Sequence, residues 1–175
     1  MSKTIRVTHV FEPVYDLSSR VLLLGTMPSP LSRENGFYYS HPQNRFWKII
    51  GTLLGEETPQ TPEQKKSLIL SHHIALWDVL ASCDIVGASD SSIKNPRPND
   101  LHIIIHNAPI QAVFFTGKKA EQLYIRLCEP IKEIPVACLP STSPANRRYS
   151  DEALLQHYTA ILPYLHETSN IYNQR

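Results

Sequence analysis

The stretch LLLGTMPSPLSRENGFYYSHPQNRFW, residues 22–47, decides how we expect the chain to fold. It continues an apolar run, Val21–Leu24, that stops at Gly25, which is the pattern of a strand buried in a parallel sheet. Residues 26–43 are polar and interrupted by prolines and a glycine, so we expect them to be irregular. A loop of this length inside a compact domain is usually functional, and we therefore expect polar chemistry where this strand ends.

The rest of the chain alternates predicted helices with predicted strands. In chain order, we expect a weak edge strand or irregular lead-in at 5–10, the strand 21–24, helices 44–54 and 62–72, a short apolar stretch 74–77, a largely irregular segment 82–99, a short helix from 99 or 100 to 106, a strand 112–115, a helix 118–128, a strand 134–139 and a helix 151–165. The polar tail after Glu167 is expected to fray. This alternation predicts an α/β domain with a mostly parallel sheet.

Length and composition limit the classes of protein that the chain can represent. Its 175 residues fit one domain, 1–175, with a core at about 20–165. With 17 Lys and Arg against 16 Asp and Glu, bulk charge gives no basis for nucleic-acid binding, so any contact with DNA must be local. Three cysteines without a CxxC spacing, and no signal peptide or long apolar segment, predict a cytoplasmic protein. We assign no role to Cys83, Cys128 or Cys138.

Two loops follow predicted strands and carry informative side chains. If both strands are parallel, the loops 25–44 and 140–149 face one crevice beyond the carboxyl ends of the sheet. The first loop offers Tyr38, Tyr39, Phe46 and Asn44, which could sandwich a planar ring and present an amide. The second offers hydroxyls, prolines and two arginines, which suit phosphate contacts. Aromatic rings beside phosphate contacts suggest a nucleotide ligand.

Several separated motifs, in this order, resemble those of the uracil-DNA glycosylase superfamily. They are GTMPSP at 25–30, YYSHPQNRFW at 38–47, LWDVL at 76–80 with Cys83, Asp90-Ser91-Ser92-Ile93, Asn99-Asp100, and STSPANRRYS at 141–150. The resemblance is closest to the hypoxanthine-DNA glycosylase branch, with mismatch-specific uracil glycosylases as cousins. It implies a three-layer α/β/α sandwich around a mostly parallel four-stranded sheet, no metal or other cofactor, and a monomer that excises a deaminated base from double-stranded DNA.

The same resemblance assigns roles to residues. Gly25, Thr26, Met27, Pro28 and Ser29 match the motif that shapes the base pocket, although none of them is the water-activating Asp or Asn of many relatives. The catalytic Asn of the hypoxanthine branch falls on Asn44, and Tyr39 or Phe46 would stack on the base. The residues expected at the DNA backbone and in the base stack are Ser141, Thr142, Ser143, Pro144, Asn146, Arg147 and Arg148. Many relatives have a His where Ser141 stands.

These residues support a hypothesis about mechanism. An extruded nucleotide would be held while the Ser143-Pro144 turn compresses the backbone, and Arg147 or Arg148 fills the gap in the stack. The Asn44 carbonyl could orient a water, and backbone N–H groups of the 25–29 loop could donate to the base. Without a carboxylate base or the His, we expect modest catalysis that favours good leaving groups such as hypoxanthine. The alternatives are a mismatch-specific uracil glycosylase and a catalytically weak protein that binds damaged DNA.

Simpler roles compete at several positions. Asn44 precedes a helical pattern and could cap it, a role that does not exclude catalysis. Trp47 belongs in the core. His41 could be a general acid near the pocket, but we expect an exposed loop residue without a role. Asp78 could meet water or a base edge, but we expect a cap or turn residue there. Arg147 and Arg148 could be a solvated charge pair.

Overall fold

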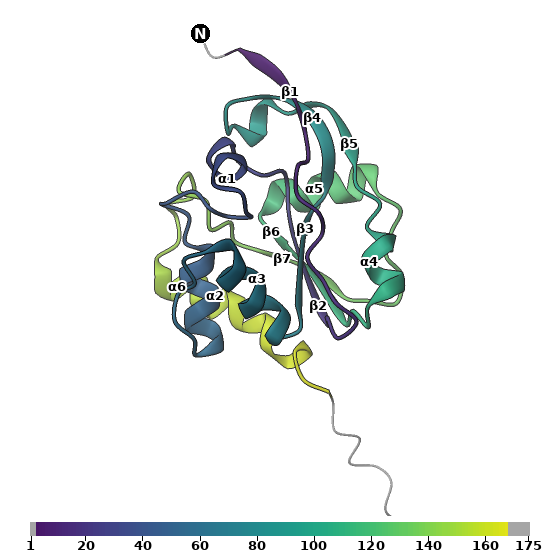
Figure 1. Cartoon of the computed structure of the whole chain (residues 1–175). Coiled ribbons are helices and arrows are strands. Elements are labelled where there is room, and N and C mark those ends of the chain that lie inside the picture. Colours follow the sequence, from purple (N-terminus) through teal and green to yellow (C-terminus); the bar gives the residue numbers. More distant parts are fainter. Residues whose placement is uncertain (1–2, 168–175) are drawn as a thin grey trace, which may run out of the picture.

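A four-stranded parallel sheet lies at the centre of the computed structural model, which describes residues 3–167 (Figure 1). Its strands are β2 (Val21–Gly25), β3 (Ile74–Asp78), β6 (Ala112–Thr116) and β7 (Val136–Leu139). They follow the order β3-β2-β6-β7, and every neighbouring pair is parallel. Since β2 is an interior strand that is buried along its whole length, its sequence is a continuous apolar run. The predicted four-stranded parallel sheet is confirmed.

Helices cover both faces of this sheet, as the predicted three-layer sandwich requires (Figure 1). They are α2 (Phe46–Leu54), α3 (Pro62–Ser71) and α6 (Asp151–Tyr158) on one side, with α4 (His102–Asn107) and α5 (Lys118–Leu127) on the other. Thr61 and Gln64 form a capping box at the start of α3, with Pro62 in the first turn. The last predicted helix ends early, because a 3-10 helix with an internal proline, Thr159–Tyr164, follows α6. The predicted fraying of the tail falls on 168–175, outside the described residues.

The prediction that residues 82–99 are largely irregular is wrong. This segment contains β5 (Lys94–Pro98) and most of β4 (Leu80–Val86), which pair antiparallel with each other. With β1 (Thr4–Thr8), they form a second sheet in the order β1-β4-β5. The prolines of β5 lie on an edge strand, where a missing N–H breaks no interior ladder. The mostly exposed residues of β1 and β5 have no apolar run that marks a strand.

The prediction that residues 26–43 are irregular is also wrong in part. A short helix, α1 (Pro30–Asn35), lies within them. The Ser29 side chain caps it by accepting the N–H of Ser32, and Gly36 ends it at a φ of 80°. Six residues are too few for helical periodicity to appear in a sequence, so only these caps could have indicated the helix.

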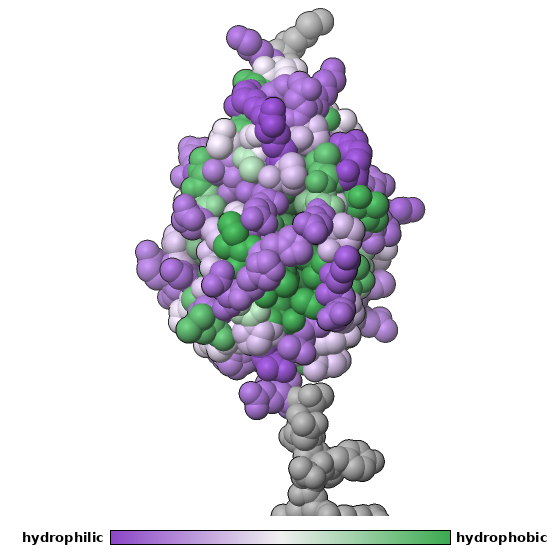
Figure 2. All heavy atoms as spheres, turned by 90° about the vertical axis from the view of Figure 1, so that its right-hand side faces the viewer, coloured by the Kyte–Doolittle hydropathy of each residue, from purple (hydrophilic) through white to green (hydrophobic). Residues whose placement is uncertain are grey.

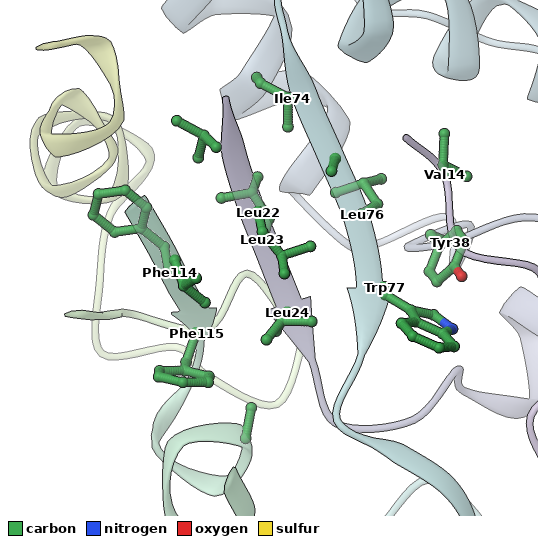
Figure 3. Close-up of a cluster of buried hydrophobic side chains, with 14 of the residues drawn as sticks. Val14, Leu22, Leu23, Leu24, Tyr38, Ile74, Leu76, Trp77, Phe114 and Phe115 are labelled. Carbon is green, nitrogen blue, oxygen red and sulfur yellow. The ribbon is translucent and has the colours of Figure 1, made fainter. Parts of the chain in front are cut away.

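Buried side chains of the parallel sheet and its flanking segments form one hydrophobic cluster. Leu22, Leu23 and Leu24 lie between the apolar residues of β3 and β6 (Figure 3). Val14 extends the cluster past β3, where its backbone N–H donates to Leu76 at 2.9 Å. The predicted core position of Trp47 is confirmed, since its side chain is 4% exposed.

The surface mixes apolar and polar residues, unlike the core. The face that carries α4 and β5 shows apolar residues between polar ones (Figure 2). Within residues 3–167, no helix combines the length and apolar character needed to cross a membrane.

We expect Leu23→Ala to lower the free energy of unfolding by about 2–5 kcal/mol, because it leaves a cavity beside a fully buried strand. Leu17→Ala is the matched control, since Leu17 is 82% exposed, and it should change stability by no more than about 0.5 kcal/mol. Urea unfolding of both variants measures the difference. Equal effects would contradict the described core.

Candidate active site

A cavity of about 230 Å³ opens where β2, β3 and β6 end. The predicted residues that line it are Gly25, Thr26, Met27, Pro28, Ser29, Tyr39, Asn44, Ser141, Thr142, Ser143 and Pro144. The two strand-end loops therefore face one crevice, as expected for parallel strands. The cavity is smaller than the roughly 300–1,000 Å³ of sites for drug-sized ligands, so it suits a small planar group.

Asn44 is held by two hydrogen bonds to its side-chain oxygen. Oδ1 accepts the backbone N–H of Phe46 at 2.9 Å and the Thr142 hydroxyl at 2.8 Å. The bond from a backbone N–H fixes which amide atom is the oxygen, and an amide oxygen has two lone pairs. Oδ1 is thus fully used, and the donors on Nδ2 remain for a ligand. Asn44 satisfies the free N–H of Phe46 at the start of α2, although the N-cap position itself falls on Arg45. Its carbonyl is not free to orient a water.

Arg45 joins the second loop to the start of α2. Its backbone N–H donates to the Thr142 carbonyl at 3.2 Å, and its guanidinium donates to the carbonyls of Tyr149 at 2.6 Å and Asn146 at 2.8 Å. The Asn146 amide donates in turn to the Ser141 carbonyl at 2.8 Å. The position of the second loop therefore depends on Arg45, which the sequence analysis missed because a lone Arg in a helical pattern carries no motif.

Polar oxygens gather around Gly25 on the cavity floor. The Thr116 hydroxyl donates to the Leu24 carbonyl at 3.3 Å, so its oxygen must accept the Tyr39 hydroxyl proton, 2.8 Å away. The Tyr39 oxygen then offers only lone pairs to a ligand. Burial and the nearby Asp78 carboxylate raise the pKa of Tyr39 well above its ordinary value, so it stays protonated.

Asp78 supplies a second acceptor on this floor. The Asp78 and His9 side chains are each 5% exposed, and Asp78 Oδ2 lies 2.7 Å from His9 Nε2. The other carboxylate oxygen, Oδ1, faces Gly25, where a Cβ atom would overlap it. The expectation of a cap or turn residue is wrong, because the side chain contacts His9 and lines the cavity. The contact between Asp78 and His9 could not be predicted from the sequence, since 69 positions separate them.

Asp90 and His41 also line the cavity. Desolvation raises the pKa of Asp90, and the Asp78 carboxylate raises it further. The prediction that His41 lies in a loop without a role is therefore wrong about its surroundings, since the loop forms part of the cavity wall.

Phe46 is a correction to the predicted base pocket. Its side chain is fully buried, and its ring stacks on Tyr39 with 3.8 Å between centroids and 13° between planes. Phe46 therefore supports the ring that lines the cavity and does not reach the cavity itself. Tyr39 adopts a φ of 52°, an uncommon conformation for a residue with a side chain, and the Phe46 stack and Thr116 bond hold it there.

The predicted DNA-contacting residues divide into two groups. Ser141, Ser143 and Pro144 are partly exposed at the cavity edge, whereas Arg147 and Arg148 are exposed outside the cavity. Thr142 is 1% exposed, and its hydroxyl is used by Asn44. The Asn146 amide is likewise used within the loop. The buried Thr142 hydroxyl is therefore not placed for a direct DNA contact, whereas the partly exposed Asn146 keeps its side-chain oxygen.

Metal ligands and reactive thiols are not features of the described chain. Within residues 3–167, no group of three His, Cys, Asp or Glu side chains could hold a metal ion. Desolvation raises the pKa of the Cys128 thiol to about 11 and raises the pKa values of Cys83 and Cys138, which opposes nucleophilic chemistry at all three.

Comparison with known proteins decides the family. Residues 12–166 match the sequence model of the Uracil DNA glycosylase superfamily. The chain belongs to this superfamily. A relative from Methanosarcina acetivorans, named hypoxanthine DNA glycosylase, is 34% identical over 155 residues, which cover 84% of this chain and 97% of the relative. A relative of the same name from Methanosarcina barkeri is 34% identical over 143 residues, covering 79% and 87%.

A solved structure shares the fold of this superfamily member. It is a solution NMR structure of a candidate uracil DNA glycosylase from Methanosarcina acetivorans, with a TM-score of 0.73 and 28% sequence identity. The match covers 90% of this chain and 99% of that chain. The predicted family and α/β/α fold are thereby confirmed.

Family membership gives the cavity floor a new significance. Many superfamily members carry an acidic or amide residue in the first motif, and the segment 25–29 has none. The cavity nevertheless contains a buried carboxylate, because Asp78 reaches it from the neighbouring strand β3.

We expect Gly25→Ala to lower the free energy of unfolding by about 1–3 kcal/mol, because its methyl group would overlap Asp78 Oδ1 and lie 2.9 Å from the Tyr39 hydroxyl. The measurement is a double-mutant cycle with Asp78→Ala by urea unfolding. The loss should be smaller in the Asp78→Ala background, and an undiminished loss would show that this crowding is not its cause.

Proposed function

We propose that the chain is a monofunctional DNA glycosylase that hydrolyses the N-glycosidic bond of a deaminated base, hypoxanthine first, and leaves an abasic site in double-stranded DNA. One observation carries the proposal: a small cavity of base-like size is lined both by hydrogen-bond acceptors, Asp78 Oδ1 and the Tyr39 oxygen, and by the amide donors of Asn44. The names of the two Methanosarcina relatives support hypoxanthine as the substrate.

The Asp78 carboxylate suits the edge that deamination creates. Adenine presents a lone pair at N1 beside an amino donor, whereas hypoxanthine presents N1–H beside the O6 acceptor. Asp78 accepts N1–H, and backbone N–H groups of the 25–29 loop donate to O6. Adenine would instead place the lone pair of N1 against the Asp78 carboxylate. The buried acceptor and donors would then lack partners, and an unpaired buried polar group is an effective way to reject a close analogue.

Uracil presents the same N–H and carbonyl pair at N3 and O4. Excision of uracil is therefore the second candidate activity, favoured by the same acceptor at Asp78. Guanine presents the same N1–H and O6 as hypoxanthine. The cavity must therefore exclude guanine by leaving too little space for its 2-amino group.

The reaction needs groups placed for developing charge. As the bond breaks, its electron pair leaves on the base nitrogen and positive charge develops on the sugar. A water then bonds to the anomeric carbon through its oxygen and gives up a proton, and the base departs protonated. Asn44 Nδ2 donates toward the negative charge on the base. Because no His stands at Ser141, this stabilisation is modest and favours good leaving groups.

DNA is held at the cavity edge. Ser141, Ser143 and Pro144 meet the phosphates on either side of the extruded nucleotide, and Arg147 or Arg148 fills the gap in the base stack. Thr142 and Asn146 act by shaping the loop. With a net charge of +1, binding should be weak and sensitive to salt. We also propose that residues 1–175 act as one domain and a monomer, in the cytoplasm at the nucleoid.

The test is incubation with duplexes that contain deoxyinosine, deoxyuridine opposite dG, or only normal bases, followed by hot alkali. We expect strand breaks first at inosine. Breaks only at uracil would favour the mismatch-specific activity, and bound but intact DNA would favour a binding protein. Asn44→Ala should lower the single-turnover rate about 100-fold, as loss of one charge-stabilising donor does.

The control for this variant is Asn107→Ala, since Asn107 lies in α4 and its amide donates to the Ile103 carbonyl. It should cleave as fast as the unaltered chain. If Asn44→Ala folds and also cleaves at that rate, Asn44 is not catalytic.

Asp78→Asn should lower the rate of inosine excision relative to adenine excision about tenfold or more, because an amide can offer a donor to the lone pair of adenine N1. Single-turnover rates on the two duplexes measure this ratio. Asp84→Asn is the matched control, since Asp84 pairs with Arg6 on the second sheet. An unchanged ratio in Asp78→Asn would assign base selection to other residues.

A further inference from the structure

Lys65 is a buried cation without a matching anion. The residue is 9% exposed, and desolvation lowers its pKa. Its ammonium donates to the Ser40 hydroxyl oxygen at 2.9 Å and lies 5.7 Å from the centroid of the Trp47 ring. Within residues 3–167, no carboxylate forms an ion pair with it. A partly desolvated ammonium is less favourable without a counter-charge, so this position suits a negative partner.

The ammonium lines a second hollow, which we call the Lys65 hollow. Its volume is about 300 Å³, and its basic and polar walls include Ser40, His41, Arg45, Lys48 and Lys65. No Asp or Glu lines it, although Arg45 and Lys48 both reach Asp151 outside it. A hollow with cations, amides and no carboxylate is suited to a phosphate.

The Lys65 hollow borders the base cavity. Tyr39, His41 and Asn44 line both spaces, so the turn 41–44 is a wall between them. Gln43 and Arg45 also line a third depression, a groove with Pro144 and Arg147. The Lys65 hollow therefore shares lining residues both with the base cavity and with this groove.

We propose that the Lys65 hollow binds one phosphodiester of the lesion-containing strand, beyond the extruded nucleotide. The inference rests on the proposed function, because that function supplies a strand whose base enters the neighbouring cavity. A phosphate at Lys65 and a base beside Asn44 would hold the turn 41–44 between them. Lys65 would thus compensate its buried charge only in the complex, through a contact separate from the Ser143-Pro144 turn.

The test is the salt dependence of binding to a duplex that carries a non-cleavable analogue of deoxyinosine, so that the base stays in place without a change at Asn44. Loss of one phosphate contact lowers the slope of log Kobs against log salt by about 0.9. We expect Lys65→Met to show this change, with about tenfold weaker binding near 0.1 M salt. Lys66→Met is the matched control, because Lys66 is the exposed neighbour on α3.

Urea unfolding separates this role from a structural one. Removing a buried, unmatched charge should leave Lys65→Met at least as stable as the parent chain. Lower stability with an unchanged salt slope would assign Lys65 to the fold and overturn the proposal. An unchanged slope with normal stability would overturn it as well.

Two further measurements show whether the bound anion belongs to DNA, and whether a negative result contradicts this inference alone or the proposed function as well. Amide chemical shifts around Ser40 should respond to the duplex and not to inorganic phosphate at the same phosphate concentration. An equal response would assign the hollow to a free anion and overturn the DNA contact. If the unaltered chain binds no inosine duplex at all, the proposed function fails together with this inference, whereas binding with an unchanged slope in Lys65→Met overturns only this inference.

Discussion

The hydrogen bond from the Thr142 hydroxyl to the Asn44 side-chain oxygen joins two loops that are 98 positions apart in the chain. Both loops follow parallel strands, so the sheet brings them to one edge, and this bond and the contacts of Arg45 link them there. The cavity lies between them. Its walls are therefore joined by polar contacts above the apolar core.

Hydrogen-bond direction gives this cavity its chemical character. The proton of Thr116 goes to a backbone carbonyl, which makes Tyr39 a donor inward and an acceptor toward the cavity. Both lone pairs of Asn44 Oδ1 are taken, which leaves its N–H groups. The cavity thus offers a ligand both acceptors and donors, although no single residue would show this by itself.

The sequence predicted what depends on local pattern. The apolar run at 21–24, the helix starts and the two strand-end loops all follow from periodicity, caps and the geometry of parallel strands. It failed where structure depends on distant partners. The strands β4 and β5 are stabilised by pairing and carry little apolar signal. The roles of Asp78 and Phe46 follow from His9 and Tyr39, which no spacing rule connects to them.

The strained backbone of Tyr39 and its stack on Phe46 have a consequence for the range of lesions that fit. A ring held on one face by Phe46 cannot shift in that direction, so the part of the cavity wall that Tyr39 forms is rigid there. Under the proposed function, this rigid wall would favour flat bases with small changes over bases enlarged by bulky adducts.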